Sequence, residues 1–190
     1  NVVSSTIARE ADGVLYTWAG PEIAVATTKA YSAQLAALYL ISVKIARVRG
    51  LISIGDERAL CTELQRLPEC ITETLKCQPD MQRIATLYAN RPSVFFLGRG
   101  LDYAAALEAS LKLKEISYIH TEAYASGELK HGTIALITED TPVVAVVTQE
   151  KLKDKELSNI REVQSRGASV VLFVRESISM ADAEYASFAS

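Results

Sequence analysis

Cysteine and histidine are scarce in this sequence, and its charges nearly balance. The 190 residues include three cysteines and two histidines, and the formal net charge is -3. No two cysteines form a Cys-x-x-Cys pair, and Cys70 and Cys77 lie seven residues apart, on one face of an expected helix. We therefore expect buried free thiols, which suit a reducing, cytoplasmic compartment. The small net charge gives no electrostatic reason to expect nucleic acid or an anionic membrane as a partner.

A long hydrophobic run is also missing. The longest apolar run covers residues 35–43, is interrupted by Ser42 and is followed by Lys44. Because a helix needs about 20 apolar residues to cross a bilayer, we expect no membrane span, and no signal-peptide pattern is found. The composition, 49% hydrophobic and 23% charged, is typical of a globular protein.

Strand and helix patterns alternate from residue 91 onwards. Short apolar runs predict strands, and amphipathic stretches predict helices at 102–117 and 154–166; the strands are expected within 94–97, 118–124, 142–147 and 169–174. This alternation predicts an α/β fold with a parallel sheet flanked by helices. The continuous run Pro-Val-Val-Ala-Val-Val at 142–147 is typical of a strand covered on both faces.

The first 90 residues have a different pattern. We expect a strand at 14–18 and a long helix over about 28–49, followed by a helical connector at 51–90. Three connector helices are expected to start at Asp56, Pro68 and Pro79. Both chain ends favour a fragment, because residues 1–3 resemble the end of a core strand and no strand follows within 177–190.

A charged row interrupts an otherwise apolar helix. The helix expected at 102–117 carries alanine or leucine over most of its circumference, yet Glu108, Lys112 and Glu115 share one narrow stripe. One interpretation is a solvated seam of charge pairs. The other is a site, because a Gly-Arg-Gly turn precedes the helix and His131 follows it in a loop bracketed by glycines. An acid/base, a cation and a histidine beside an anion-binding turn suit proton transfer on a phosphorylated sugar.

The N-terminal segment places hydroxyl groups after an apolar strand end. Val2 and Val3 precede Ser4 and Ser5. At the carboxyl end of an α/β strand, such hydroxyls and the neighbouring amides suit a phosphate or a sugar. The alternative is an N-cap for a short turn at 7–10.

Five motifs in this order resemble one known family, the isomerase part of the glucosamine-6-phosphate synthases, also called glutamine–fructose-6-phosphate aminotransferases. The resemblance covers nearly the whole chain. It is densest at Gly-Pro-Glu-Ile (20–23), Thr-Lys-Ala-Tyr (28–31), Gly-Arg-Gly (98–100), Leu-Lys-Leu-Lys-Glu-Ile (111–116) and Gly-Glu-Leu-Lys-His-Gly (127–132).

The resemblance implies parts of two sugar-isomerase (flavodoxin-like) units, each a five-stranded parallel sheet with helices on both faces. Residues 1–50 would finish the first unit, 51–90 would connect the two, and 91–190 would form the second, incomplete at its C-terminus. The implied reaction makes glucosamine 6-phosphate from fructose 6-phosphate and ammonia, which a separate glutaminase domain releases from glutamine. The implied assembly is a homodimer, and the isomerase part needs no metal or organic cofactor.

The resemblance also implies residue roles. Glu115 matches the acid/base that moves a proton between C1 and C2, and Lys112 matches a lysine near the developing enediolate oxygen. His131 matches the histidine assigned to ring opening, which the neighbouring subunit supplies. The substrate-binding backbone segment matches Val2, Val3, Ser4 and Ser5.

The sequence departs from the family pattern in several places. The phosphate loop (Ser-Gln-Ser-Gly-Glu-Thr), the C-terminal Schiff-base lysine and the glutaminase domain are not among the 190 residues, so we expect negligible turnover from this chain alone. Ser4 stands where the family usually has glycine, and Thr133 where it usually has proline. Two alternatives remain: a sugar-phosphate-binding regulatory module of the same fold, and a purely structural α/β half-domain.

Overall fold

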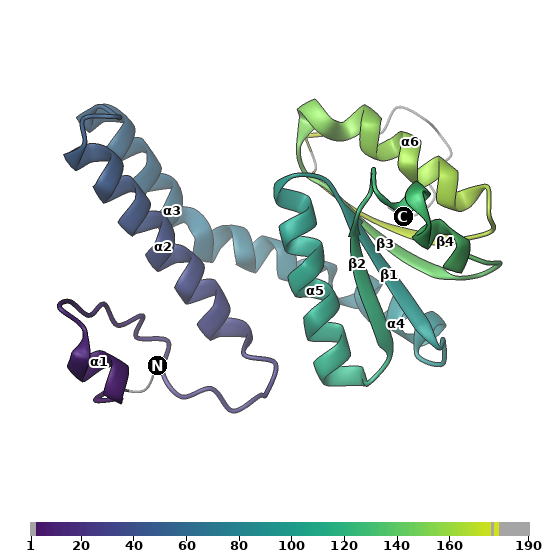
Figure 1. Cartoon of the computed structure of the whole chain (residues 1–190), viewed down its shortest axis with the longest axis horizontal. Coiled ribbons are helices and arrows are strands. Elements are labelled where there is room, and N and C mark those ends of the chain that lie inside the picture. The colour runs from purple at the N-terminus through teal and green to yellow at the C-terminus, as the bar shows by residue number, and fades with distance from the viewer. Residues whose placement is uncertain (1–2, 176, 179–190) are drawn as a thin grey trace. The chain divides into compact units, whose positions relative to one another are not determined.

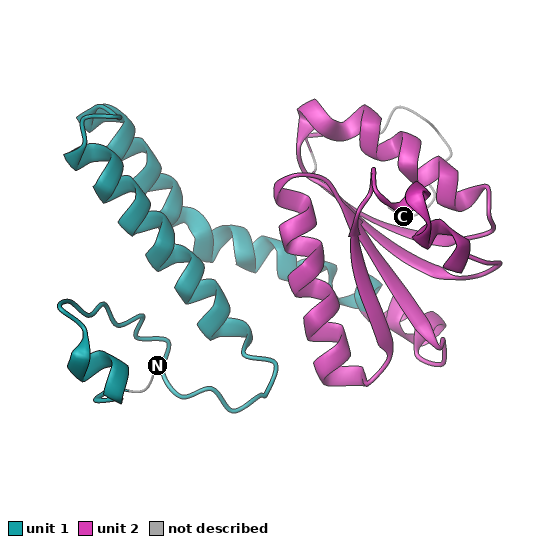
Figure 2. Cartoon of the chain, in the orientation of Figure 1, with its two compact units in different colours: residues 1–81 teal, residues 82–190 magenta. Residues whose placement is uncertain are grey.

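The computed structural model describes residues 3–175, 177 and 178, and the chain divides into two compact units. Unit 1 comprises residues 1–81 and unit 2 comprises residues 82–190 (Figures 1 and 2). The helix α4 (Gln78–Tyr88) spans the boundary between them in the sequence.

Unit 2 is built on a four-stranded parallel sheet. The strands are β1 (Ser93–Gly98), β2 (His120–Ala125), β3 (Pro142–Val147) and β4 (Ser169–Val174). Their order is β2-β1-β3-β4, and Phe96 of β1 is in register with Ala123 of β2 and Val144 of β3. The predicted α/β class and parallel sheet are confirmed, although the resemblance implied five strands and the described part of unit 2 contains four.

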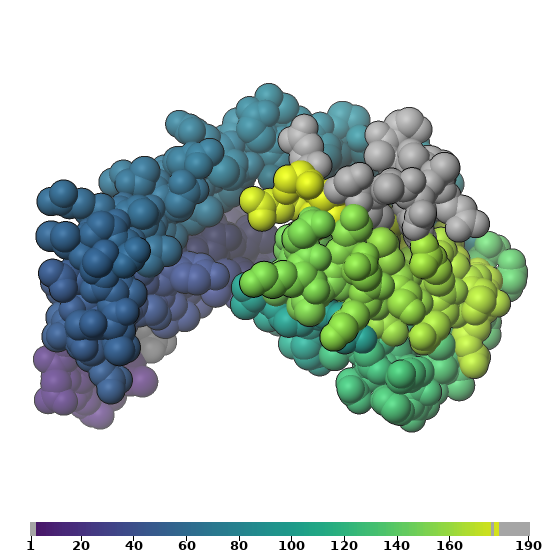
Figure 3. Space-filling model, turned by 90° about the horizontal axis from the view of Figure 1, so that it is seen from above, coloured from purple at the N-terminus to yellow at the C-terminus, as the bar shows by residue number. Residues whose placement is uncertain are grey.

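Two helices cover opposite faces of this sheet. Strand side chains alternate between the faces, so Phe95 and Leu97 pack in a core that includes Ile160 of α6 (Lys153–Gln164). Val94 and Phe96 pack in a second core that includes Ala106 of α5 (Leu101–Ser117). In Figure 3 the light-green side chains of α6 form much of the face of unit 2 turned to the viewer.

Short 3-10 helices connect these elements. They are η2 (Leu129–His131), η3 (Thr133–Leu136) and η4 (Glu150–Leu152). Leu129 is almost fully buried in the same core as Phe95 and Leu97, so the loop after β2 is anchored to the α6 side of the sheet.

Unit 1 consists of helices without an enclosed core. Its elements are α1 (Thr6–Glu10), α2 (Thr28–Val48), α3 (Ile54–Thr74), η1 (Leu75–Cys77) and the start of α4. Within the described part of unit 1, Ala26 is the only buried residue. α3 starts with a capping box in which the Asp56 N–H donates to Ser53 Oγ (3.1 Å) and the Ser53 N–H donates to Asp56 Oδ2 (2.9 Å).

Several local predictions for unit 1 are wrong. Pro68 lies inside α3 instead of starting a helix. The helix that begins after the Ser53 cap continues past Pro68, although proline has no backbone N–H and one helical hydrogen bond is therefore missing. Residues 14–18 form no strand, since the described part of unit 1 offers no neighbouring strand with which to pair. Val3 lies in a turn and is 60% exposed, and the rest of the strand end expected at residues 1–3 lies outside the described residues.

The prediction of free thiols is confirmed, but that of buried ones is not. Cys61, Cys70 and Cys77 are all free; Cys70 is exposed, and the other two are partly exposed. They lie on α3 and η1, where unit 1 has no enclosed core to bury them. Among the described residues, no helix has the length and hydropathy required to span a membrane.

Candidate active site

Glu108, Lys112 and Glu115 form one charged row along α5, as the helical spacing predicted. Lys112 Nζ lies 3.1 Å from Glu108 Oε1 and 3.1 Å from Glu115 Oε2. Their side chains are between 20% and 29% exposed. The three side chains of the row are thus partly buried, and their exposure alone does not separate a site from a seam of charge pairs.

The two carboxylates keep Lys112 cationic. Partial burial lowers the pKa of the Lys112 ammonium, but the hydrogen bonds and negative charges of Glu115 and Glu108 outweigh it and raise the pKa above its ordinary value. Lys112 therefore presents a fixed positive charge and is unsuited to accept a proton itself.

The turn between β1 and α5 sets the position of this row. A Cβ at Gly98 would lie 2.5 Å from the carbonyl carbon of Asp102, and Gly100 has a φ of +57°. Only glycine allows both the close approach and the positive φ. α5 therefore starts directly above the carboxyl end of β1.

The chain's own polar groups form hydrogen bonds at this turn, and the anion-binding site expected there stays a prediction. The Asp102 carboxylate accepts hydrogen bonds from the N–H (2.9 Å) and hydroxyl of Thr148. Gln149 Nε2 donates to the carbonyl oxygen of Arg99 (2.6 Å). The first turn of α5 is thus tied by its own side chains to the residues that follow β3.

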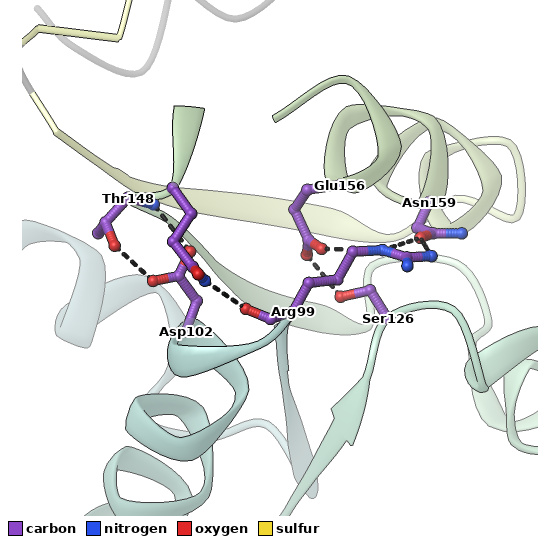
Figure 4. Close-up of polar contacts among 7 residues, drawn as sticks. Arg99, Asp102, Ser126, Thr148, Glu156 and Asn159 are labelled. Carbon is purple, nitrogen blue, oxygen red and sulfur yellow. Dashed lines mark hydrogen bonds and ion pairs between the residues drawn. The ribbon is translucent and has the colours of Figure 1, made fainter. Parts of the chain in front are cut away.

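A buried polar network lies beside the turn (Figure 4). Arg99 Nη2 donates to Asn159 Oδ1 (2.8 Å), and Arg99 Nε lies 3.7 Å from Glu156 Oε2. Ser126 Oγ donates to Glu156 Oε1 (2.5 Å), and the Glu156 side chain is only 2% exposed. Burial raises the pKa of the Glu156 carboxyl, while Ser126 and Arg99 partly oppose that shift and Asp102 adds to it.

The sequence reasoning missed this network. Its signal was available, because Glu156 shares a helical face with Ile160 and Val163, and a charged residue on an apolar face is unusual. Arg99 was recognised only as part of a glycine turn. Glu108 was recognised in the charged row but given no role.

His131 is not brought to the charged row within this chain. It ends η2, is exposed, and its backbone N–H donates to the carbonyl oxygen of Glu128 (3.1 Å). In the part of the chain that the structure describes, no hydrogen bond or ion pair joins its imidazole to Lys112 or Glu115.

The N-terminal candidates lie in unit 1, where Val3 and Ser4 are exposed and Val2 is outside the described residues. Ser4 has a φ of +64°, which fits a position where the family usually has glycine. Ser5 occupies the N-cap position of α1 but forms no side-chain cap, and its buried Oγ has no hydrogen-bond partner among the described residues.

Comparisons with known proteins agree with this architecture. The family model of the SIS domain matches residues 87–185. Glutamine–fructose-6-phosphate aminotransferases (isomerizing) from Caldanaerobacter subterraneus subsp. tengcongensis and Symbiobacterium thermophilum are 54% and 56% identical to the chain over 176 residues, or 93% of its length. The chain spans 29% of the length of each of these two proteins.

A solved structure gives the same result. The C-terminal domain of glucosamine-fructose-6-phosphate aminotransferase from Francisella tularensis is similar to this chain with a TM-score of 0.90 and 43% sequence identity. The match covers 93% of this chain and 50% of that one. The high TM-score indicates that the two chains share a similar backbone fold.

Proposed function

The chain belongs to the SIS domain family, and on that premise we propose that it forms part of the isomerising site of a glutamine–fructose-6-phosphate aminotransferase. The observation that carries the proposal is the Lys112 ammonium held 3.1 Å from each of two carboxylates on one helix. The named relatives support it, because proteins of that name match 93% of this chain.

In the proposed reaction Glu115 moves one proton between adjacent sugar carbons. Its carboxylate takes a proton from C1, the C–H electron pair becomes the C1–C2 double bond, and the π electrons of the C2 carbonyl move onto its oxygen. The C1 hydroxyl then gives its proton to the C2 oxygen and becomes the C1 carbonyl, while the carboxylic acid returns its proton to C2. Lys112 stabilises the negative charge that develops on the sugar oxygen, and its raised pKa suits a group that stays charged throughout.

Glu108 completes the row as a positioning residue for Lys112. Its Oε1 lies 3.1 Å from Nζ, one helical turn from Lys112 on the side away from Glu115. With Glu108 present, the ammonium stays in place when Glu115 is protonated during the reaction.

The remaining partners are part of the same proposal. His131 would open the sugar ring from the neighbouring subunit of a homodimer, which accords with its exposure and its lack of contact with Lys112 and Glu115. Val2, Val3, Ser4 and Ser5 would contact the sugar phosphate. A glutaminase domain would supply ammonia in the cytoplasm.

Substitution of Glu115 tests the proposal in the complete polypeptide that contains these 190 residues. Glu115→Gln should lower isomerisation about 10²–10⁴-fold, since it removes the acid/base, while the sugar phosphate still binds.

Lys112→Met should also lower turnover, and Lys114→Met is its matched control, because Lys114 lies on the same helix, is exposed and has no ion pair with the row. Product formation and sugar-phosphate binding are the measurements. Full turnover by Glu115→Gln would overturn the assignment, and binding without any turnover in the unchanged protein would favour a regulatory module.

A further inference from the structure

The loop that carries His131 is fixed at its start by the buried network. The Ser126 N–H donates to the carbonyl oxygen of Gly98 (3.1 Å), and the Ser126 hydroxyl donates to Glu156 (2.5 Å). A Cβ at Gly127 would lie 2.5 Å from Arg99 Nη2, so the guanidinium lies directly against the backbone of the loop. Glu156 thus holds Ser126, and Arg99 lies against Gly127. These are the first two residues of the segment 126–131, which ends at His131.

The rest of the loop is short and is anchored once more before His131. The side chain of Leu129 is buried in the core, and the Glu128 N–H donates to the carbonyl oxygen of Ala125 (2.8 Å). His131 lies two residues beyond Leu129 and is exposed. A shift at Ser126 or Gly127 would therefore be transmitted to His131 along a few residues of backbone.

A carboxylate is a poor choice for this position if stability is its only purpose. Glu156 lies on the apolar face of α6, and its side chain is buried. Its Oε2 has no hydrogen-bond partner among the described residues. Burying a carboxylate is costly, and an apolar side chain of similar size is often as stable or more stable. A directional hydrogen bond from Ser126 and a negative charge facing Arg99 are what glutamate provides and leucine would not.

We propose that Glu156, acting with Arg99 and Ser126, is a positioning residue that fixes the loop at 126–131 and so places His131 for the reaction. The inference rests on the proposed function, because it needs His131 to act on the sugar. It adds residues from α6 and from the β1–α5 turn that have no contact with the charged row.

A double-mutant cycle in the complete polypeptide tests this proposal. Glu156→Gln keeps the shape of the side chain but removes its negative charge, so the ion pair with Arg99 is lost. We expect it to lower kcat/KM about tenfold, a typical effect of misplacing a reacting group by a fraction of an ångström. In a His131→Ala background the same change should have less than about a twofold effect, because there is no longer an imidazole to misplace.

Two further variants keep the test independent of folding defects. Glu162→Gln is the matched control, since Glu162 lies on α6 and its side chain is only partly buried. Gly127→Ala reaches the network without a change of charge and should show the same coupling to His131. Gly13→Ala is its control, because an added Cβ there meets nothing within 4 Å.

The outcomes separate the two proposals. If His131→Ala retains full activity, the role of the histidine in the proposed function fails, and this inference fails with it. If His131→Ala is impaired but Glu156→Gln is harmless, or equally harmful in both backgrounds, the positioning role alone is overturned. Coupling of both Glu156→Gln and Gly127→Ala to His131 would support it.

Discussion

The two units use similar helices to very different effect. In unit 2, Leu97, Val143 and Ile160 are completely buried between a sheet and its helices. In unit 1, α2 forms where a long helix was expected, yet its apolar residues Leu38 and Ile45 are 58% and 52% exposed. The difference shows that periodicity determines which residues share a face, while burial depends on whether another element covers that face.

Charged groups follow the same division. Arg47 and Glu57 form an ion pair of 3.4 Å in unit 1, with side chains 39% and 29% exposed. Glu156 in unit 2 is 2% exposed and faces Arg99 at 3.7 Å. Water can reach both partners of the first pair, but in the second it reaches only Arg99, whose side chain is 29% exposed, so the energetic consequences of changing Glu57 and Glu156 should differ.

The largest expected effect contrasts Leu97→Ala with Leu38→Ala. Leu97→Ala leaves a cavity in a closed core and should lower the free energy of unfolding of unit 2 by about 2–5 kcal/mol. Leu38→Ala removes an exposed side chain and should change stability by less than about 0.5 kcal/mol. Denaturant titration of both variants checks this, and a large cost for Leu38→Ala would mean that the apolar face of α2 is covered in solution.

A smaller effect should appear in the pH dependence of unit 2. The pKa of Glu156 is raised by burial and by Asp102, although Ser126 and Arg99 oppose the shift. The folded state therefore binds this proton more tightly than the unfolded state, and stability rises as the pH falls from above the folded pKa towards the ordinary value of 4.5.

The Glu156→Gln variant should lack this gain. The difference in the free energy of unfolding between the two proteins should therefore change steadily as the pH falls over that range. Thermal unfolding at several pH values measures it, with Glu162→Gln as the control. A parallel pH response of Glu156→Gln and the unchanged protein would show that the Glu156 carboxyl is solvated.

The sequence predicted the elements of unit 2 well because their signals are local. The strands at 142–147 and 169–174 were predicted with their exact bounds, and the other two strands and α5 were placed within one or two residues. In unit 1 the strand expected at 14–18 failed because an extended apolar segment becomes a strand only beside a partner, which the sequence pattern does not reveal. The helix start predicted at Pro68 was wrong, because proline is compatible with the first turn of a helix and also, at a cost in stability, with the interior of a helix that begins upstream.

The candidate site divides in the same way. The row of Glu108, Lys112 and Glu115 follows from helical spacing alone and was found. The contact of Glu156 with Ser126 joins residues thirty positions apart, and no local pattern pairs them. If the neighbouring subunit supplies His131, its position relative to the row is set by the dimer and not by a single chain. The role of His131 in ring opening therefore remains a prediction.

The smallest expected effect tests whether unit 1 opens independently of unit 2. Ser53→Ala removes the hydroxyl that caps α3 and should favour local opening of that helix by about 1 kcal/mol. Hydrogen exchange at the amides of Asp56 and Glu57 measures the change, and Ser32→Ala in α2 is the control, because the Ser32 hydroxyl only bonds back to its own helix. Ser53 lowers the pKa of Asp56, so the effect should hold at neutral pH and fade as the pH falls below the ordinary value of 3.8. Exchange in β1 and β3 should stay the same, since their protection comes from the closed core of unit 2; a matching loss of protection there would mean that the two units unfold together.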